Sequence, residues 1–223
     1  NTPKKYQHMF EDYFFLYTPI WLLRKVTFAY DGYLMHFKPN KGDVVLDCGA
    51  YEGHFSIIAS RLVGKKGMVY SFEPQDEMAD IMRKKFSKYG LSNIRVINKG
   101  IFSHKSSMLV DKGTYNAGFS ILDPDKSVND QVRIDLIDID SFVIDYKLKR
   151  LDFVKMDIEG AEIEALKGAK EALNKFFPKT VIASYHIRDG SKTAGWVENF
   201  LIDQGFKSWT GFPAHLTTYG IKK

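Results

Sequence analysis

Short apolar runs alternate with amphipathic stretches from Lys41 onward, and this alternation constrains the fold more than any other feature of the sequence. The apolar runs predict buried strands, and helical spacing of apolar residues predicts helices between them. The first strands and helices are expected, in order, at 43–48, 55–63, 68–72, 77–89 and 93–97. Strands that alternate with helices pair in parallel through right-handed crossovers, with helices on both faces. The sequence therefore predicts an α/β fold with a doubly wound, mostly parallel sheet.

The alternation is interrupted between residues 101 and 145. Two short alternating runs, SSMLVD and VRIDLID, flank a loop rich in Gly, Asn, Asp and Pro. This pattern predicts a hairpin-like insertion, with the loop at 116–129 as a candidate substrate gate. The regular pattern then resumes with expected strands at 151–157 and 180–186 and helices at 161–177 and 196–204. Two closing runs, FKSWTGF and HLTTYGI, predict an antiparallel hairpin at the edge of the sheet.

The first forty residues are unusually aromatic, and their rings fall near helical spacing. We expect residues 1–40 to form an N-terminal helical segment and residues 41–223 to form the main domain. The simplest interpretation is a helical pair packed on that domain. A lid over a substrate pocket, a dimer surface and a membrane-surface helix remain alternatives.

Bulk properties narrow the class of protein. A chain of 223 residues fits one domain with a substantial core, and no apolar stretch approaches the length of a membrane span. The single cysteine, Cys48, excludes an internal disulfide and fits a reducing compartment, so we expect a cytoplasmic protein. No signal peptide is visible, and because the first residue is not methionine we expect a fragment or a processed form. The net charge of +5 is spread along the chain without a dense basic stripe, so nucleic acid is not favoured as a partner.

The turn after the first strand carries the first functional signal. It has the sequence DCGAYEG at 47–53, so its glycines follow G-x-x-x-G spacing and not the G-x-G-x-x-G of dinucleotide-binding proteins. A preceding acid and a poorly shielded backbone suit a ligand with both an ammonium and a carboxylate group, such as the amino-acid end of S-adenosylmethionine. The turn residues expected to bind this cofactor are Asp47, Gly49, Ala50, Tyr51, Glu52 and Gly53.

Glu73, which follows the second strand, is the second signal. An acid at this place accepts hydrogen bonds from both ribose hydroxyls of a bound nucleoside, in NAD and S-adenosylmethionine sites alike. We expect Pro74, Asn98, Gly100 and Asp157 to complete the cofactor site. The alternative is a glycine turn beside a surface Glu that binds no ligand.

The segment DFVKMDIEGAEIEALKGA at 152–169 resembles the signature of the FkbM-type S-adenosylmethionine-dependent methyltransferases. The matching positions are Lys155, Asp157, Glu159, Gly160, Glu162, Leu166, Gly168 and Ala169. The resemblance extends from about Lys41 to His186, although many members have Asn where this chain has Tyr51 and a smaller residue or Ile at Glu52. It implies a Rossmann-like class I methyltransferase fold, S-adenosylmethionine as cofactor, and O-methylation of a hydroxyl on a sugar, a glycan or a small natural product.

Asp157, Glu159 and His186 are the candidate catalytic residues, because each lies at or just after the end of a predicted strand. They suit either a base with its orienting acid or a site for a divalent metal. We favour the metal-free version, since neither the one histidine nor the two acids have the sequence spacing that is diagnostic of metal ligands. Glu162 is interpreted as a charge that complements the helix dipole, and His215 shows no spacing that suggests a ligand.

Three other functions remain open at this stage. An RNA methyltransferase is compatible with the mild basic charge. An NAD-dependent oxidoreductase would also have parallel strands and an acid at the position of Glu73, but this chain lacks the G-x-G-x-x-G motif of such enzymes. A non-catalytic module that keeps the cofactor fold is the third alternative.

Overall fold

A seven-stranded sheet forms the centre of the computed structural model, which describes residues 12–22, 32–111 and 131–223. The strand order is β11-β12-β8-β7-β1-β2-β3. The strands are β1 Val44–Cys48, β2 Met68–Phe72, β3 Ile94–Ile97, β7 Phe153–Met156, β8 Lys179–Ala183, β11 Phe206–Gly211 and β12 Thr217–Lys222. The strands from β8 to β3 are parallel, and β12 runs antiparallel to both β8 and β11. The predicted doubly wound class I fold with a terminal antiparallel hairpin is confirmed.

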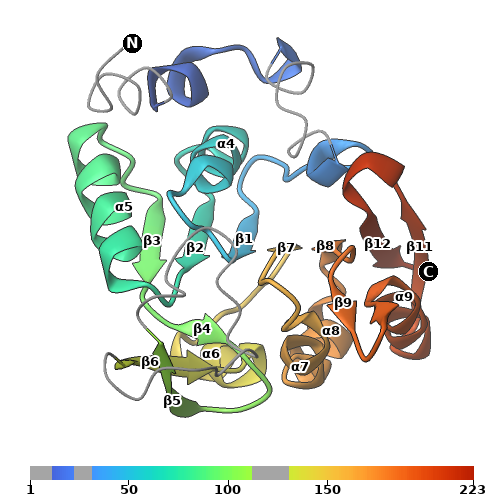
Figure 1. The fold of residues 1–223 in the computed structure, drawn as a ribbon. Coiled ribbons are helices and arrows are strands. Elements are labelled where there is room, and N and C mark those ends of the chain that lie inside the picture. The colour runs from blue at the N-terminus through green and yellow to red at the C-terminus, as the bar shows by residue number, and fades with distance from the viewer. Residues whose placement is uncertain (1–11, 23–31, 112–130) are drawn as a thin grey trace.

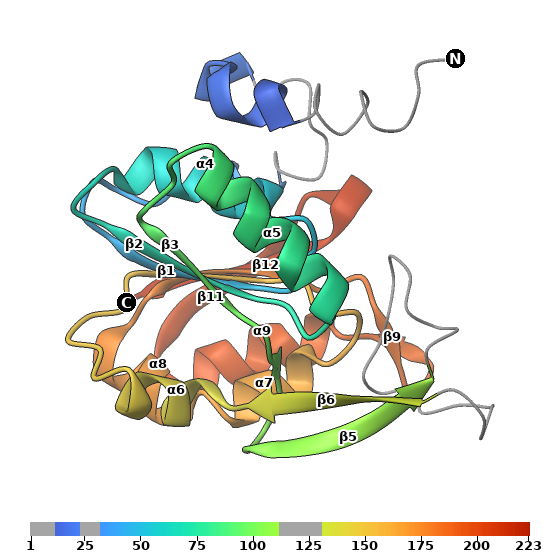
Figure 2. The ribbon, with the colours of Figure 1, turned by 90° about the vertical axis from the view of Figure 1, so that its left-hand side faces the viewer.

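Helices cover both faces of this sheet (Figures 1 and 2). Helices α4 (His54–Val63) and α5 (Asp76–Lys88) pack on one face. The other face carries α6 (Ile139–Asp145), α7 (Glu162–Lys167), α8 (Lys170–Phe176) and α9 (Ala194–Asp203). Side chains alternate along β1, so Leu46 and Cys48 join the core under α6 to α9, whereas Val45 joins the core under α4 and α5.

A second sheet of three strands contains β4 (Gly100–Ile101), β5 (Ser106–Asp111) and β6 (Gln131–Ile137). Strands β5 and β6 pair antiparallel, so the predicted hairpin-like insertion is confirmed. Its proposed gate at 116–129 lies outside the described residues. The sequence pattern did not predict β4, the short pair β9 (Ile187–Arg188) and β10 (Ser191–Lys192), or helix α6. Asp138 caps the N-terminus of α6, where its side chain accepts a hydrogen bond from the Ser141 amide at 2.6 Å.

The single helix predicted at 161–177 is divided into α7 and α8 at Gly168. A Cβ atom at Gly168 would lie 2.7 Å from both the Asp138 Cβ and the Phe102 carbonyl oxygen. The chain therefore passes close to two other segments where one helix ends and the next begins. Helical periodicity did not reveal this break, because it depends on contacts with residues distant in sequence.

Residues 12–17 form a helix that lies across the α4 and α5 face (Figure 2). Phe15 is buried there and stacks on His54 with ring centroids 4.3 Å apart. Asp12 reaches the buried Lys85 at 2.8 Å, and Lys85 also donates to the carbonyl of Glu52 in the glycine turn. The segment is thus packed against the main domain beside that turn, while the boundary between residues 40 and 41 stays a prediction. Within the described parts of the chain, no helix has the length and apolar character needed to cross a bilayer.

Replacing Gly49 with alanine is expected to destabilise the fold more than the same change at Gly42. Both residues have a left-handed φ, +77° and +86°, so both variants carry the strain of a side chain in that conformation. A Cβ at Gly49 would also lie only 1.8 Å from the Asp157 carbonyl oxygen, whereas nothing lies within 4 Å at Gly42. We expect urea denaturation to show an extra loss of about 1–3 kcal/mol for Gly49→Ala, the usual cost of overpacking. Equal losses in the two variants would contradict this packing.

Candidate active site

The sheet topology brings the predicted site residues to one edge. Strands β1, β2, β7 and β8 are parallel, so Cys48, Phe72, Met156 and Ala183 end at the same side of the molecule. Ligands of doubly wound sheets bind at this carboxyl edge. The glycine turn, Glu73, Asp157 and His186 all follow these strand ends.

The glycine turn is held by backbone hydrogen bonds to the end of β2. The amides of Gly49 and Ala50 both donate to the Phe72 carbonyl, at 3.1 and 2.9 Å. Gly53 has φ +81°, and a Cβ there would lie 2.5 Å from the Phe86 ring. The need for glycine at positions 49 and 53 therefore comes from close packing against β7 and α5 within the protein, which the sequence analysis had attributed to the ligand.

Glu73 is buried and accepts one backbone hydrogen bond on each carboxylate oxygen. The donors are the Tyr51 amide at 2.9 Å and the Gln75 amide at 3.0 Å. Burial raises the pKa of Glu73 to about 7, although both amides oppose the shift. Each oxygen keeps a lone pair for a further donor, so the carboxylate fits two ribose hydroxyls. Asn98 supports this corner by donating to the carbonyls of Glu73 and Pro74, at 3.1 and 3.2 Å.

Asp47 lies in a fully buried polar cluster below the glycine turn. Strand register places it beside Ser71 on β2 and Lys155 on β7. The Lys155 ammonium lies 3.1 Å from Asp47 Oδ1, and Ser56 donates to Oδ2 at 2.6 Å. Lys155 also donates to the Gly49 carbonyl at 2.7 Å. Asp47 therefore orients the glycine turn through Lys155, and its burial argues against the alternative that it meets the ammonium group of a ligand.

Glu52 and Tyr51 differ in their surroundings. The Glu52 carboxylate lies 3.6 Å from Lys85 and 4.0 Å from His54, so it faces the N-terminal segment and α5. Tyr51 is exposed and has a left-handed φ of +50°. Glu159 in the turn after β7 also has a left-handed φ, of +55°. Non-glycine residues in this conformation are uncommon and cluster at functional sites. Both turns at the carboxyl edge thus hold such a residue.

Two tyrosines hold the Asp157 carboxylate. Tyr33 donates to Oδ2 at 2.7 Å, and Tyr185 donates to Oδ1 at 3.3 Å. Burial and the nearby Asp157 and Glu159 charges raise the pKa of Tyr185, so its hydroxyl keeps its proton and remains a donor. The Asp157 side chain is 23% exposed and is therefore fixed in place yet reachable from solvent.

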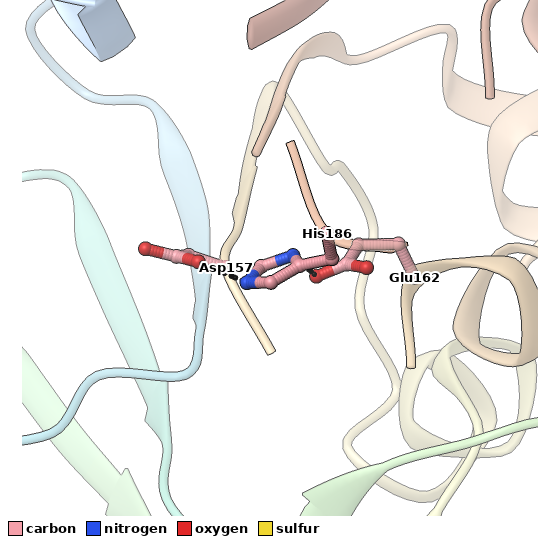
Figure 3. Close-up of side chains that lie close together, drawn as sticks. All are labelled: Asp157, Glu162 and His186. Atoms are coloured by element: carbon pink, nitrogen blue, oxygen red, sulfur yellow. Dashed lines mark ion pairs between the residues drawn. The ribbon is translucent and has the colours of Figure 1, made fainter. Parts of the chain in front are cut away.

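His186 lies between carboxylates on both sides of its ring (Figure 3). Nδ1 lies 3.1 Å from Oε1 of the fully buried Glu162, while Nε2 lies 3.4 Å from Glu159 and 3.8 Å from Asp157. Burial lowers the pKa of His186, but the close carboxylates of Glu159 and Glu162 outweigh it and raise the pKa to about 10. The ring is an imidazolium at neutral pH. The expected role of His186 as a neutral base oriented by Asp157 does not fit this arrangement.

Asp157, Glu162 and His186 bring one donor atom each to within 4.8 Å of one another. A shared metal ion would need one donor atom of each residue to point at a common position. The imidazole instead lies between the two carboxylates, with Nδ1 toward Glu162 and Nε2 toward Asp157 (Figure 3). We interpret the group as an ion-pair network and assign no metal to it.

The sequence of this domain matches a known family over most of its length. The family model of the methyltransferase FkbM domain matches residues 47–208. The chain belongs to the FkbM methyltransferase family. The predicted resemblance is confirmed, and the family assignment also supports the predicted cofactor, S-adenosylmethionine.

Solved structures agree on the fold. An FkbM methyltransferase from Methylobacillus flagellatus KT has a TM-score of 0.63 at 21% identity, covering 84% of this chain and 45% of that one. Fibrillarin from Aeropyrum pernix, solved with natively bound S-adenosyl-L-methionine, has a TM-score of 0.56 at 14% identity and covers 88% of this chain and 74% of that one. At these identities the likeness is one of fold.

One curated relative is a probable cobalt-precorrin-6B C(15)-methyltransferase (decarboxylating) from Saccharolobus solfataricus. It is 36% identical over 67 residues, which are 30% of this chain and 34% of that protein. The FkbM chain therefore spans about a third of the length of this relative and just under half of the M. flagellatus chain.

Three residues that contact Asp157 or His186 were not predicted from the sequence as part of the candidate site: Tyr33, Glu162 and Tyr185. Glu162 was interpreted as a dipole charge, yet it is fully buried and its Oε1 also accepts from the Ile158 amide at 3.1 Å. A glutamate in the first turn after a predicted catalytic strand was the available signal. Tyr33 lies 124 residues from Asp157, and no local pattern connects them.

Proposed function

We propose that the protein transfers the methyl group of S-adenosylmethionine to a hydroxyl of a sugar, a glycan or a small natural product. The observation that carries this proposal is the pair of carboxylates at the carboxyl edge, where Asp157 lies against the start of the glycine turn and both Asp157 and Glu159 lie near His186. Carboxylates accept hydrogen bonds strongly from hydroxyl donors. Two partly exposed carboxylates therefore suit an acceptor that carries several hydroxyl groups.

The cofactor half of the site comprises the residues named from the sequence. Glu73 would accept the ribose hydroxyls, and the 49–53 turn would pass along the cofactor, supported from below by Asp47. Pro74, Asn98 and Gly100 would line the adjoining corner, where Asn98 fixes the backbone after β2. When bound, the cofactor supplies an electrophilic methyl group on a positively charged sulfur.

The acceptor half comprises Asp157, Glu159 and His186. Asp157 is held by its two tyrosines, and it would accept a hydrogen bond from one of the hydroxyl groups of the acceptor. The His186 imidazolium offsets part of the negative charge of the three carboxylates around it. This arrangement would orient the acceptor oxygen toward the methyl group, and orientation is a major part of the rate of such a transfer.

The state of the single cysteine bears on the cellular location of the protein. Cys48 is buried and unpaired, as is common for a thiol in a reducing compartment. We keep the cytoplasm as the proposed location.

The test is a transfer assay with isotopically labelled S-adenosylmethionine and a panel of acceptors. The panel contains methyl glycosides, disaccharides, polyhydroxylated macrolides, primary amines and mixed RNA. We expect label in the hydroxyl compounds. Label in amines or RNA alone would overturn the proposal, and calorimetry showing NAD binding without S-adenosylhomocysteine binding would move the chain to the oxidoreductases.

Glu73→Ala is expected to weaken S-adenosylhomocysteine binding by roughly tenfold or more, because a lost hydrogen bond to a charged group costs about 1.5–3 kcal/mol. Glu77→Ala is the matched control, since Glu77 is an exposed acid on the next helix. Calorimetric titration of both variants measures the difference. Equal affinities in the two would remove the ribose assignment.

A further inference from the structure

The terminal hairpin contributes a histidine to the carboxyl edge. Strand β12 runs antiparallel to β8, and its first residue, Thr217, pairs with Ala183 at the end of β8. The short helix Pro213–His215 that precedes β12 therefore lies at the edge where the parallel strands end. Topology alone thus brings His215 to the same side of the sheet as Asp157 and His186.

Ring contacts place His215 against the tyrosines that hold Asp157. Its ring centroid lies 5.3 Å from that of Tyr33 and 4.6 Å from that of Tyr185, both in edge-on geometry. Nδ1 is shielded from solvent and has no hydrogen-bond partner among the described residues, whereas Nε2 is not among the shielded atoms. His215 therefore differs from His186, because carboxylates face both nitrogens of His186.

We propose that Nε2 of His215 is the general base that takes the proton of the acceptor hydroxyl. This inference rests on the proposed hydroxyl methylation. In the step, a lone pair of the acceptor oxygen forms a bond to the methyl carbon, and the carbon–sulfur bond breaks with its electron pair going to sulfur. The oxygen–hydrogen bond breaks, and the proton moves to Nε2, giving an imidazolium, a methyl ether and a neutral thioether. His215 removes the proton of the hydroxyl that is methylated, and Asp157 accepts a hydrogen bond from a neighbouring hydroxyl of the acceptor, because a carboxylate can only accept.

The two histidines are suited to different roles by their surroundings. Burial lowers the pKa of His215, Asp157 opposes that shift, and the His186 imidazolium and the Lys155 ammonium reinforce it. The other titratable groups against its ring are Tyr33 and Tyr185. His215 is therefore neutral at pH 7 while His186 is charged, and such separated pKa values are typical of residues with distinct acid–base roles.

The first measurement needs no acceptor. Histidine ring signals of the full chain, saturated with S-adenosylhomocysteine, are followed by NMR from pH 5 to 9, and assigned with His215→Gln and His186→Gln. We expect the His215 signal to titrate below pH 6.5 and the His186 signal to remain that of an imidazolium at neutral pH. A His215 that is protonated at pH 7 would overturn the proposal even if no acceptor in the panel is methylated.

The second measurement uses an acceptor that the wild-type chain methylates. His215→Gln should lower kcat by roughly 10²–10⁴, the usual span for a general base, and leave S-adenosylhomocysteine affinity within about twofold. The acidic limb of the wild-type kcat–pH profile should disappear in this variant. His104→Gln, which changes an exposed histidine elsewhere, should leave kcat unchanged.

Chemical rescue separates a base from a packing residue. His215→Gly leaves space for a small molecule, so added imidazole should restore part of the lost kcat. Full activity in His215→Gln, or failure of imidazole to rescue a folded His215→Gly protein, would overturn the assignment of this base. Neither result would affect the proposed function, which fails only if the wild-type chain transfers no methyl group to hydroxyl compounds.

Discussion

Asp47→Ala is expected to lower the free energy of unfolding by about 3–5 kcal/mol, because it leaves the Lys155 ammonium buried without its partner. Both side chains are almost completely buried, and their charged atoms lie 3.1 Å apart. Lys155 also contacts the carbonyl oxygens of Cys48 and Gly49 and lies over the rings of Tyr33 and Phe55, at 5.5 and 5.9 Å, but none of these groups carries a negative charge. The sequence alone predicts Asp47 as a cofactor-binding residue, whereas its burial against Lys155 predicts a large effect on stability.

Two comparisons make this prediction specific. Asp80 and Arg83 form an exposed ion pair of similar length, 2.7 Å, so Asp80→Ala should cost only about 0–1 kcal/mol. The double variant Asp47→Ala/Lys155→Met removes both buried charges and should be less destabilised than the sum of the two single changes. Urea denaturation of the wild type, Asp47→Ala, Asp80→Ala, Lys155→Met and the double variant measures these losses. Additive losses in the double variant would show that Asp47 and Lys155 do not stabilise each other.

The order of strands and helices could be predicted because it depends on periodicity within short stretches. The runs around Val44–Cys48 and Met68–Phe72 are apolar and bounded by Gly or charged residues, and the observed strands match them closely. Helix α6 was missed because its seven residues follow directly on the alternating run of β6. Its signal was a single capping aspartate, Asp138.

Part of the candidate site could be predicted because its residues directly follow strands that the sequence pattern reveals. Residues that follow predicted parallel strands, such as Glu73, Asp157 and His186, could be assigned to one edge without knowing the strand order. The strand register decides which of these residues touch, and register is a tertiary property. Asp47 meets Lys155 because β1 and β7 are neighbours, and His215 reaches the site because β12 is antiparallel.

Position 51 shows how conformation explains a departure from the family pattern. Many members have Asn there, and Asn tolerates the left-handed conformation better than most residues. This chain holds Tyr51 at φ +50° and leaves its ring exposed. The turn keeps its hydrogen bond from the Tyr51 amide to Glu73, so the backbone contact survives the change of side chain.

Glu73 is expected to make the protein less stable as the pH rises from 4.5 to 7. Its pKa is raised from 4.5 to about 7 by burial, so between these values the folded protein binds a proton that the unfolded chain has lost. The folded state is therefore favoured at low pH, and this contribution disappears as the pH passes the folded pKa. A shift of this size corresponds to about 3 kcal/mol.

Glu73→Gln isolates this contribution, because glutamine does not titrate. Its amide group can replace only one of the two acceptors that the Tyr51 and Gln75 amides use, which adds a cost that does not change with pH. The stability of the wild type relative to Glu73→Gln should fall by about 3 kcal/mol between pH 4.5 and pH 7.5, measured by urea denaturation in matched buffers. A constant difference across that range would mean that Glu73 titrates normally. The same proton opposes ligand binding, since ribose hydroxyls bond best to the ionised carboxylate. S-adenosylhomocysteine affinity should therefore rise with pH over the range in which the apo protein loses stability, and Glu73→Gln should show neither trend.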